Sequence, residues 1–223
     1  MKFGFGQLMF VLFGADHDQL ERARDQLLEL TAGWHRTEIE QLVEETLEQV
    51  ADPLFYAEAL TLIDEHRRER RKVFLVSASP EQIVRPIGRH IGVSDIIATR
   101  IKTDPDGFFL AEVEQYAMGP GKAEAMLAAA TRQGIDLERS YAYSDSATDL
   151  PMMELVGHPY AVNPDRELRK VANEREWPIL EFSRSVSLPR LPRPHPVVSK
   201  ATISAAVIGA VTYAVLRRRE NRG

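Results

Sequence analysis

Short apolar runs alternate with amphipathic stretches through the middle of the chain. Buried strands are expected at 73–76, 96–98, 141–143, 160–162 and 179–182. Between them the apolar spacing predicts helices, at 81–91, 122–134, 152–156 and 165–176. A turn at 103–107, rich in Asp, Pro and Gly, predicts a hairpin between Ile101 and residues 109–113. Strands that alternate with helices predict an α/β fold built on a doubly wound, Rossmann-like parallel sheet.

The first 71 residues show a different, helical pattern. A leucine-rich stripe predicts a helix over 16–30, and Thr37 with Glu40 resembles a capping box that opens a helix over 37–50. Asp52-Pro53 predicts the start of a third helix that runs to about Arg71. Three helices before any clear strand predict a helical cap over the α/β core.

The pattern therefore predicts four segments: a helical cap at 1–71, an α/β core at 72–183, a proline-rich linker at 184–200 and an apolar and basic tail at 201–223. Residues 201–216 carry no charge, but as a helix they would span about 24 Å, short of the ~30 Å hydrocarbon core. A helix that begins at Val197 instead of residue 201 would reach about 30 Å. We expect a single membrane-spanning helix there, with an interfacial helix or a fraying terminus as the alternatives.

Charge separates the tail from the body. The chain has a net charge of −5, and residues 184–223 hold eight Lys and Arg against the single acid Glu220, so the tail is +7 and the remainder −12. An acidic body argues against nucleic acid as the main partner. The absence of cysteine excludes disulfides and fits a reducing compartment. We therefore expect a cytoplasmic domain associated with a membrane through its C-terminal segment.

Polar residues that could hold a phosphate follow the predicted strands. Ser77 comes directly after the 73–76 strand, so its hydroxyl and the backbone N–H of Ala78 could bind a phosphate oxygen. Lys122 falls in the first turn of a helix, where the helix dipole disfavours a cation unless an anion is near. Each feature has a plainer explanation, a helix N-cap for Ser77 and a solvated side chain for Lys122.

Two carboxylates follow the 141–143 strand. Asp145 and Asp149 are four residues apart, a spacing that places both on one face if a helix begins early, with Ser146 or Thr148 as its cap. Hard oxygen donors of this kind suit Mg²⁺. The alternative is that both residues only cap the turn. Together with Ser77 and Lys122, they describe a candidate phosphate and metal site.

These motifs, in this order, resemble the haloacid dehalogenase superfamily, in its phosphoserine-phosphatase-like branch, subfamily IB. The resemblance rests on 73–77 as the second motif, 119–122 as the third and 143–149 as the fourth, with 160–165 similar to the closing strand and turn. It implies that Ser77 and Ala78 bind the phosphoryl group and that Lys122 neutralises its charge. Asp145 would ligate Mg²⁺, and Asp149 would order Mg²⁺, its waters or Lys122.

This chain departs from the family's pattern at the first motif. An apolar strand should end in Asp-x-Asp-x-Thr, whose first Asp is the nucleophile, but the chain offers only Asp16-His-Asp18-Gln-Leu20 after the apolar run. We interpret this segment as the start of the first cap helix, and the alternative is that Asp16 and Asp18 are the first motif itself. The central strand would then be missing, and the strands that end at Ser77 and Ser144 would each have an open edge. An N-terminal extension that supplies the strand is expected to restore solubility and activity.

The resemblance implies a Mg²⁺-dependent phosphomonoester hydrolase that works through an aspartyl-phosphate. Its substrate would be phosphoserine or another small phosphate ester. In the phosphoserine-specific members of that family, two glycines follow the serine of the second motif. Here Ser77 is followed by Ala78-Ser79-Pro80, so the sequence does not favour phosphoserine over other esters. The alternative is a degenerate family member that has lost its nucleophile and acts as a membrane-recruited binding or scaffold protein.

Overall fold

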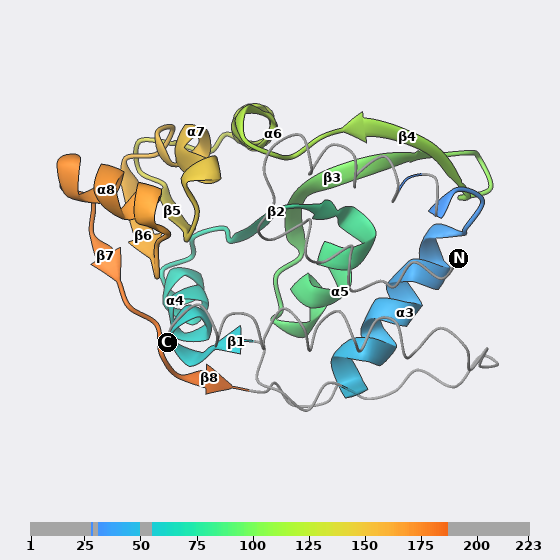
Figure 1. Ribbon diagram of the computed structural model, residues 1–223, viewed down its shortest axis with the longest axis horizontal. Helices are drawn as coiled ribbons and strands as arrows, with labels where there is room; N and C mark the ends of the chain where they lie inside the picture. Colours follow the sequence, from blue (N-terminus) through green and yellow to red (C-terminus); the bar gives the residue numbers. More distant parts are fainter. Residues whose placement is uncertain (1–27, 29–30, 50–54, 187–223) are drawn as a thin grey trace.

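A computed structural model describes residues 28, 31–49 and 55–186 (Figure 1). The helices are α3 (Arg36–Gln49), α4 (Ala57–Arg68), α5 (Glu81–His90), α6 (Pro120–Gln133), α7 (Leu150–Met153) and α8 (Arg166–Glu174), with a 3₁₀ turn, η1 (Ala147–Asp149). The strands are β1 (Phe55–Tyr56), β2 (Phe74–Pro80), β3 (Asp95–Thr103), β4 (Phe109–Gln115), β5 (Tyr141–Ser144), β6 (His158–Val162), β7 (Ile179–Leu180) and β8 (Ser185–Val186).

The described strands form two three-stranded sheets and one short pair. In the order β2-β3-β4, β2 and β3 are parallel and β3 and β4 form the expected antiparallel hairpin. The other sheet, β5-β6-β7, is parallel throughout. The fold is therefore α/β with mixed sheets, and the single parallel sheet that we expected is divided between β2 and β5. Within the described residues these two strands each lack a partner on one side.

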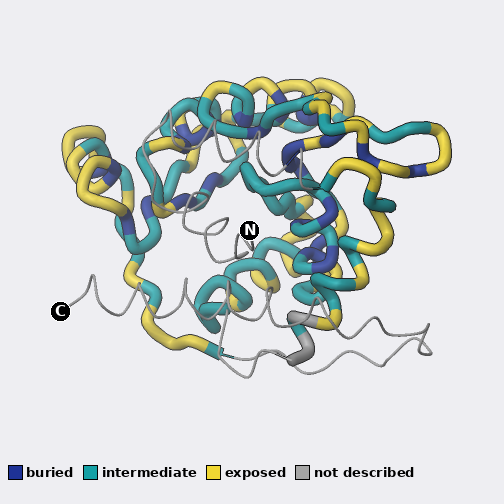
Figure 2. Tube along the Cα trace, turned by 45° about the vertical axis from the view of Figure 1, so that its right-hand side comes forward, coloured by how far each residue is buried: buried dark blue, intermediate teal, exposed yellow. Residues whose placement is uncertain are grey.

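Helices cover both faces of the β2-β3-β4 sheet. Ile97 of β3 packs with Ala125 and Ala129 of α6, whereas the side chain of the preceding residue, Ile96, lies close to Gly88 of α5. Neighbouring residues of a strand point to opposite faces, so a continuous apolar run needs cover on both sides. Figure 2 shows the resulting buried positions along the strands and on the inner sides of these helices.

A second core fills the other half of the molecule. It joins α7, β6 and α8 through their fully or nearly fully buried apolar side chains: Met152, Met153, Ala161, Leu168 and Ala172. Val76 of β2 and Met126 of α6 pack against this cluster and also against the cluster around Ile97. The two halves are therefore in apolar contact although no described strand pairing joins their sheets.

Helix α3 packs along α5 and is capped differently from our expectation. The helix begins one residue before Thr37, and the acid that reaches back to the N-terminus is Glu38, whose Oε2 accepts from the His35 N–H at 3.3 Å. Glu40, predicted to be the capping-box acid, instead pairs with Arg89 of α5 at 3.1 Å. The predicted box was wrong because the pairing with α5 depends on tertiary packing.

The third predicted helix begins later than Asp52-Pro53. Phe55 and Tyr56 form β1, which pairs antiparallel with Val186 and Ser185 of β8, and α4 begins only at Ala57. Residue 184 reinforces this contact, because the Ala57 N–H donates to its carbonyl oxygen at 2.8 Å. A two-residue strand has too little periodicity to be seen in the sequence, so the helix prediction ran through it.

Several expectations concern residues outside the described part of the chain. The helix over 16–30, the Asp16–Asp18 segment and the apolar tail at 201–223 lie there, apart from Leu28, and so remain predictions. No helix in the described ranges is long and apolar enough to cross a bilayer. The four segment boundaries also stay predictions.

Candidate active site

The end of β2 carries the predicted phosphate-binding serine. The register between β2 and β3 shifts between Val76 and Pro80, so the backbone of Ser77–Ser79 departs from the regular ladder. In this irregular segment the Ser79 N–H donates to the Ser77 hydroxyl oxygen at 3.1 Å. Because that oxygen accepts from the amide, the hydroxyl proton of Ser77 is available to an acceptor such as a phosphoryl oxygen.

Two glycines set the entry to α6 and thereby the position of Lys122. Gly119 has a φ of +51°, which a side chain would disfavour, and Pro120 occupies the first helical turn. A Cβ on Gly121 would clash with the carbonyl oxygen of Tyr116. The backbone before Lys122 is thus folded back on itself, which directs this side chain inward, where it is buried.

The turn after β5 holds the predicted carboxylates in different environments. Ser146 caps η1, its hydroxyl accepting from the Thr148 N–H at 3.3 Å, as one of the two expected caps. Asp149 is buried at the end of η1, and its Oδ2 accepts from the Ser144 hydroxyl at 2.7 Å. Asp145, directly after β5, is exposed. The sequence spacing did not foresee that a 3₁₀ turn separates them.

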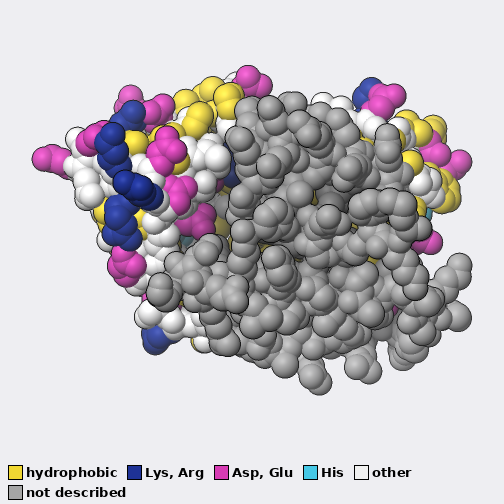
Figure 3. All heavy atoms as spheres, viewed as in Figure 1, with side chains coloured by type: hydrophobic (Ala, Val, Ile, Leu, Met, Phe, Trp, Pro, Cys, Tyr) yellow, Lys and Arg dark blue, Asp and Glu magenta, His cyan; other side chains and the backbone are white. Residues whose placement is uncertain are grey.

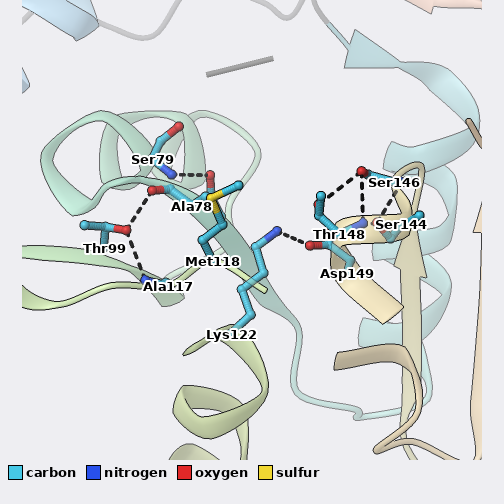
Figure 4. A network of polar contacts seen from close by, with 12 residues as sticks. Ala78, Ser79, Thr99, Ala117, Met118, Lys122, Ser144, Ser146, Thr148 and Asp149 are labelled. Atoms are coloured by element: carbon cyan, nitrogen blue, oxygen red, sulfur yellow. Dashed lines mark hydrogen bonds and ion pairs between the residues drawn. The ribbon is translucent and has the colours of Figure 1, made fainter. Parts of the chain in front are cut away.

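A buried ion pair joins the two halves of the molecule. Lys122 Nζ lies 2.5 Å from Asp149 Oδ1, and the side chains are only 10% and 12% exposed. Figure 4 shows Lys122 extending from α6 toward Asp149, past the end of β2 where Ala78 and Ser79 lie. The third and fourth motifs therefore meet beside the end of β2, in the region at the carboxyl ends of strands where open α/β sheets bind ligands.

Three polar residues for which no role was predicted support this arrangement. Ser144 donates to Asp149, and Asp165 accepts from the N–H groups of Ala147 (2.9 Å) and Leu168 (2.7 Å), tying η1 to the start of α8. Thr99 of β3 donates to the Ala78 carbonyl oxygen at 2.7 Å. Nothing in the local pattern around Thr99 or Ser144 marks them, because their partners are distant in sequence or turned toward them only by the fold.

The donors present fit a magnesium site in part. Asp145 offers an exposed carboxylate of the oxygen type that Mg²⁺ prefers. Both oxygens of Asp149, in contrast, are already engaged by Lys122 and Ser144. Among the residues that the structure describes, no three His, Cys, Asp or Glu side chains gather in a way that could hold a metal. Of the roles that the resemblance allows for Asp149, the geometry fits the ordering of Lys122.

Comparison with known proteins identifies the family. Residues 6–154 match the haloacid dehalogenase-like hydrolases, a range that includes Asp16 and Asp18 as well as the three motifs above. The chain belongs to the haloacid dehalogenase-like hydrolases. It is 48% identical over 223 residues to a probable phosphatase of Mycobacterium tuberculosis, with 98% of this chain and 77% of the relative aligned. Phosphoserine phosphatase SerB1 of the same organism is 30% identical over 222 residues, covering 99% and 70%.

A solved structure of the family agrees with the fold. The phospho-aspartyl intermediate analogue of phosphoserine phosphatase superposes with a TM-score of 0.55 at 20% identity, covering 80% of this chain and 79% of the other. At that identity the likeness concerns the fold alone. The family and the hydrolase class predicted from the sequence are confirmed, and none of these haloacid dehalogenase relatives supports the non-catalytic scaffold alternative.

Proposed function

We propose that this haloacid dehalogenase-like hydrolase is a Mg²⁺-dependent phosphatase of small phosphate monoesters. The observation that carries the proposal is the buried Lys122–Asp149 pair beside the end of β2. A lysine in the first turn of a helix is unfavourable without an anion, and burying it costs more. A cation kept there at such a cost is well suited to bind a second anion, the phosphoryl group of a substrate.

The proposed roles follow from the donors of each residue. Lys122 has three N–H donors, one of which is directed to Asp149, so the others can reach a phosphoryl oxygen. The Ser77 hydroxyl and the Ala78 N–H would bind the same group from the β2 side. Asp149 would hold Lys122 in place. These contacts would orient the phosphoryl group and offset the charge that builds up during its transfer.

Asp145 would ligate the Mg²⁺ ion, which when bound supplies further positive charge to the phosphoryl oxygens. By the family resemblance, a carboxylate from outside the described residues would attack phosphorus. Its oxygen would form the new P–O bond as the bond to the ester oxygen breaks, giving an aspartyl-phosphate that water then hydrolyses. Phosphoserine is one candidate substrate, since a relative is named for it.

The test is the release of inorganic phosphate from a panel of monoesters that includes phosphoserine and an aryl phosphate. We expect turnover with Mg²⁺, its loss in EDTA, and its loss in Lys122→Met. Asp145→Asn should require more Mg²⁺ for half-maximal activity. Lys102→Met, which removes an exposed lysine with a carboxylate partner far from the site, is the matched control. Equal turnover of Lys122→Met and the control would exclude the proposed site.

A further inference from the structure

Thr99 connects the two phosphate-binding segments through a single hydroxyl. It lies on β3 with only 4% of its surface exposed. Its Oγ1 donates to the Ala78 carbonyl oxygen at 2.7 Å and accepts from the Ala117 N–H at 3.1 Å. Figure 4 shows Thr99 between these two backbone groups, at the β2 end of the candidate site.

The direction of each hydrogen bond is fixed by chemistry. A backbone N–H can only donate, so Thr99 must accept from Ala117 and its own proton must go to the carbonyl oxygen of Ala78. That carbonyl belongs to the same planar peptide group as the Ser79 N–H. The Ser79 N–H in turn donates to the Ser77 hydroxyl oxygen at 3.1 Å. Thr99 therefore acts on Ser77 through one rigid peptide plane.

The same hydroxyl also holds the segment that leads to Lys122. Ala117 is completely buried and lies five residues before Lys122, just ahead of the Gly119–Gly121 turn. The strand register of β2 is broken beside Thr99, so the regular ladder is interrupted at the point where its side chain bonds to Ala78. Movement of either segment away from the other would break one of the two bonds to Thr99.

We propose that Thr99 is a positioning residue for the phosphate site. Its hydroxyl fixes the Ala78–Ser79 peptide that turns the Ser77 proton outward, and it keeps that peptide in register with the entry to α6. The functional part of this inference rests on the proposed phosphatase activity. The structural part does not, because it concerns two backbone amides that can be observed directly.

The experiment compares Thr99→Val, which keeps the shape and removes the hydroxyl, with Thr99→Ser, which keeps the hydroxyl. Amide hydrogen exchange measured by NMR should accelerate about tenfold or more at Ser79 and Ala117 in Thr99→Val. In Thr99→Ser it should stay close to that of the wild type. Thr61→Val removes a hydroxyl bonded at 2.9 Å to a backbone carbonyl in α4, away from the site, and is the matched control.

A second measurement links this exchange to ligand binding. Titration with inorganic phosphate should show an affinity about tenfold weaker in Thr99→Val than in wild type, with Thr99→Ser and Thr61→Val close to wild type. Unchanged exchange at Ser79 in Thr99→Val would overturn the positioning role. So would equal losses in the valine and serine variants, since the hydroxyl kept by serine would then not preserve the site, and the loss would reflect packing around residue 99 and not the hydrogen bonds.

The two proposals can fail separately. A wild-type protein that neither binds phosphate nor hydrolyses any ester counts against the proposed function, while exchange at Ser79 and Ala117 still decides the role of Thr99. If the wild type and Thr99→Val both bind phosphate with the same affinity, the phosphate site is supported and the role given to Thr99 is overturned.

Discussion

Two lysine–carboxylate pairs of almost equal length occupy opposite environments in this protein. Lys122 and Asp149 are 2.5 Å apart and only 10% and 12% exposed, whereas Lys102 and Glu112 are 2.6 Å apart and 49% and 63% exposed. The second pair joins neighbouring strands of the β3–β4 hairpin. Water surrounds the charges of the hairpin pair and screens them. In the buried pair, little water reaches Lys122 or Asp149, so each charge is stabilised mainly by the other. Surroundings, not distance, decide what such a pair does.

The surface supports this contrast. Over the α8 end of the molecule, basic and acidic side chains lie interspersed on the face seen in Figure 3, and pairs such as Arg169–Glu181 are about half exposed or more. Such pairs are typical of a solvated helix and strand surface. The buried pair differs in that a further polar group bonds to it: the Ser144 hydroxyl donates to Oδ2 of Asp149, the oxygen that does not face Lys122. Convergence of that kind is characteristic of a site.

The largest expected effect comes from removing the cation of the buried pair. Lys122→Met leaves the Asp149 carboxylate buried without its partner, which should lower the free energy of unfolding by about 3–5 kcal/mol. Urea unfolding measures this loss, and Lys102→Met should be close to wild type in the same assay. A double variant, Lys122→Met with Asp149→Leu, should recover stability but not phosphate binding. Equal unfolding free energies for Lys122→Met and Lys102→Met would contradict the contrast between the buried and the exposed pair.

The second prediction tests the backbone that places Lys122. A Cβ at Gly121 would clash with the carbonyl oxygen of Tyr116, and one at Gly157 would clash with that of Glu138. Both alanine variants should lose about 1–3 kcal/mol of unfolding free energy, because backbone atoms cannot turn aside as a side chain can.

Only Gly121→Ala should also weaken the binding of inorganic phosphate, measured on the folded fraction, since Gly157 lies before β6 and away from Lys122. Equal phosphate affinity in both variants would show that the turn before α6 does not determine the position of the ammonium group.

Much of this arrangement could be predicted from the sequence because it depends on local patterns. The apolar run before Ser77, the glycines and proline before Lys122 and the Ser146 cap each specify their own structure within a few residues. The partners across the fold could not be predicted from these local patterns. Only the family resemblance included Lys122 among the possible partners of Asp149, and the pairing of Glu40 with Arg89 depends on packing between segments distant in the sequence.

A third prediction concerns a partly buried titratable group between α4 and β5. His66 Nε2 lies 2.9 Å from the Tyr143 hydroxyl, and Arg71 Nη1 lies 3.2 Å from Nδ1. Arginine can only donate, so Nδ1 accepts and the neutral ring donates from Nε2 to Tyr143. Burial, and secondly the charge of Arg71, lower the pKa of His66, while Glu69 and Glu65 oppose the shift.

The sign of the pH effect follows from that lowered pKa. As the pH falls through the ordinary histidine value of about 6.5, the unfolded chain binds a proton that the folded protein resists. Stability should therefore be full above about pH 7 and decline until the pH passes below the folded pKa. Burial raises the pKa of Tyr143 to about 12, so its hydroxyl stays neutral throughout. The thermal unfolding temperature of His66→Phe should decline less than that of the wild type as the pH falls over this range. Parallel plots of unfolding temperature against pH for the two proteins would exclude His66 as the cause.

The smallest effect is expected at the exposed hairpin pair. The hydrogen bond and charge of Lys102 lower the pKa of Glu112, and Glu112 raises the pKa of Lys102. A lowered carboxylate pKa adds stability above the unfolded value, which is lost as the pH falls through the folded one. At this exposed position the contribution to unfolding should be too small to resolve.

The pair is better followed by NMR titration of the Glu112 carboxyl group. Its pKa should lie below the ordinary value at low ionic strength and return toward it in about 1 M salt, where screening acts within about 3 Å. Lys102→Met should produce the same return without salt. If salt left the shift unchanged, the hairpin pair would be shielded from water in the way that the Lys122–Asp149 pair is, and the distinction between the two would fail.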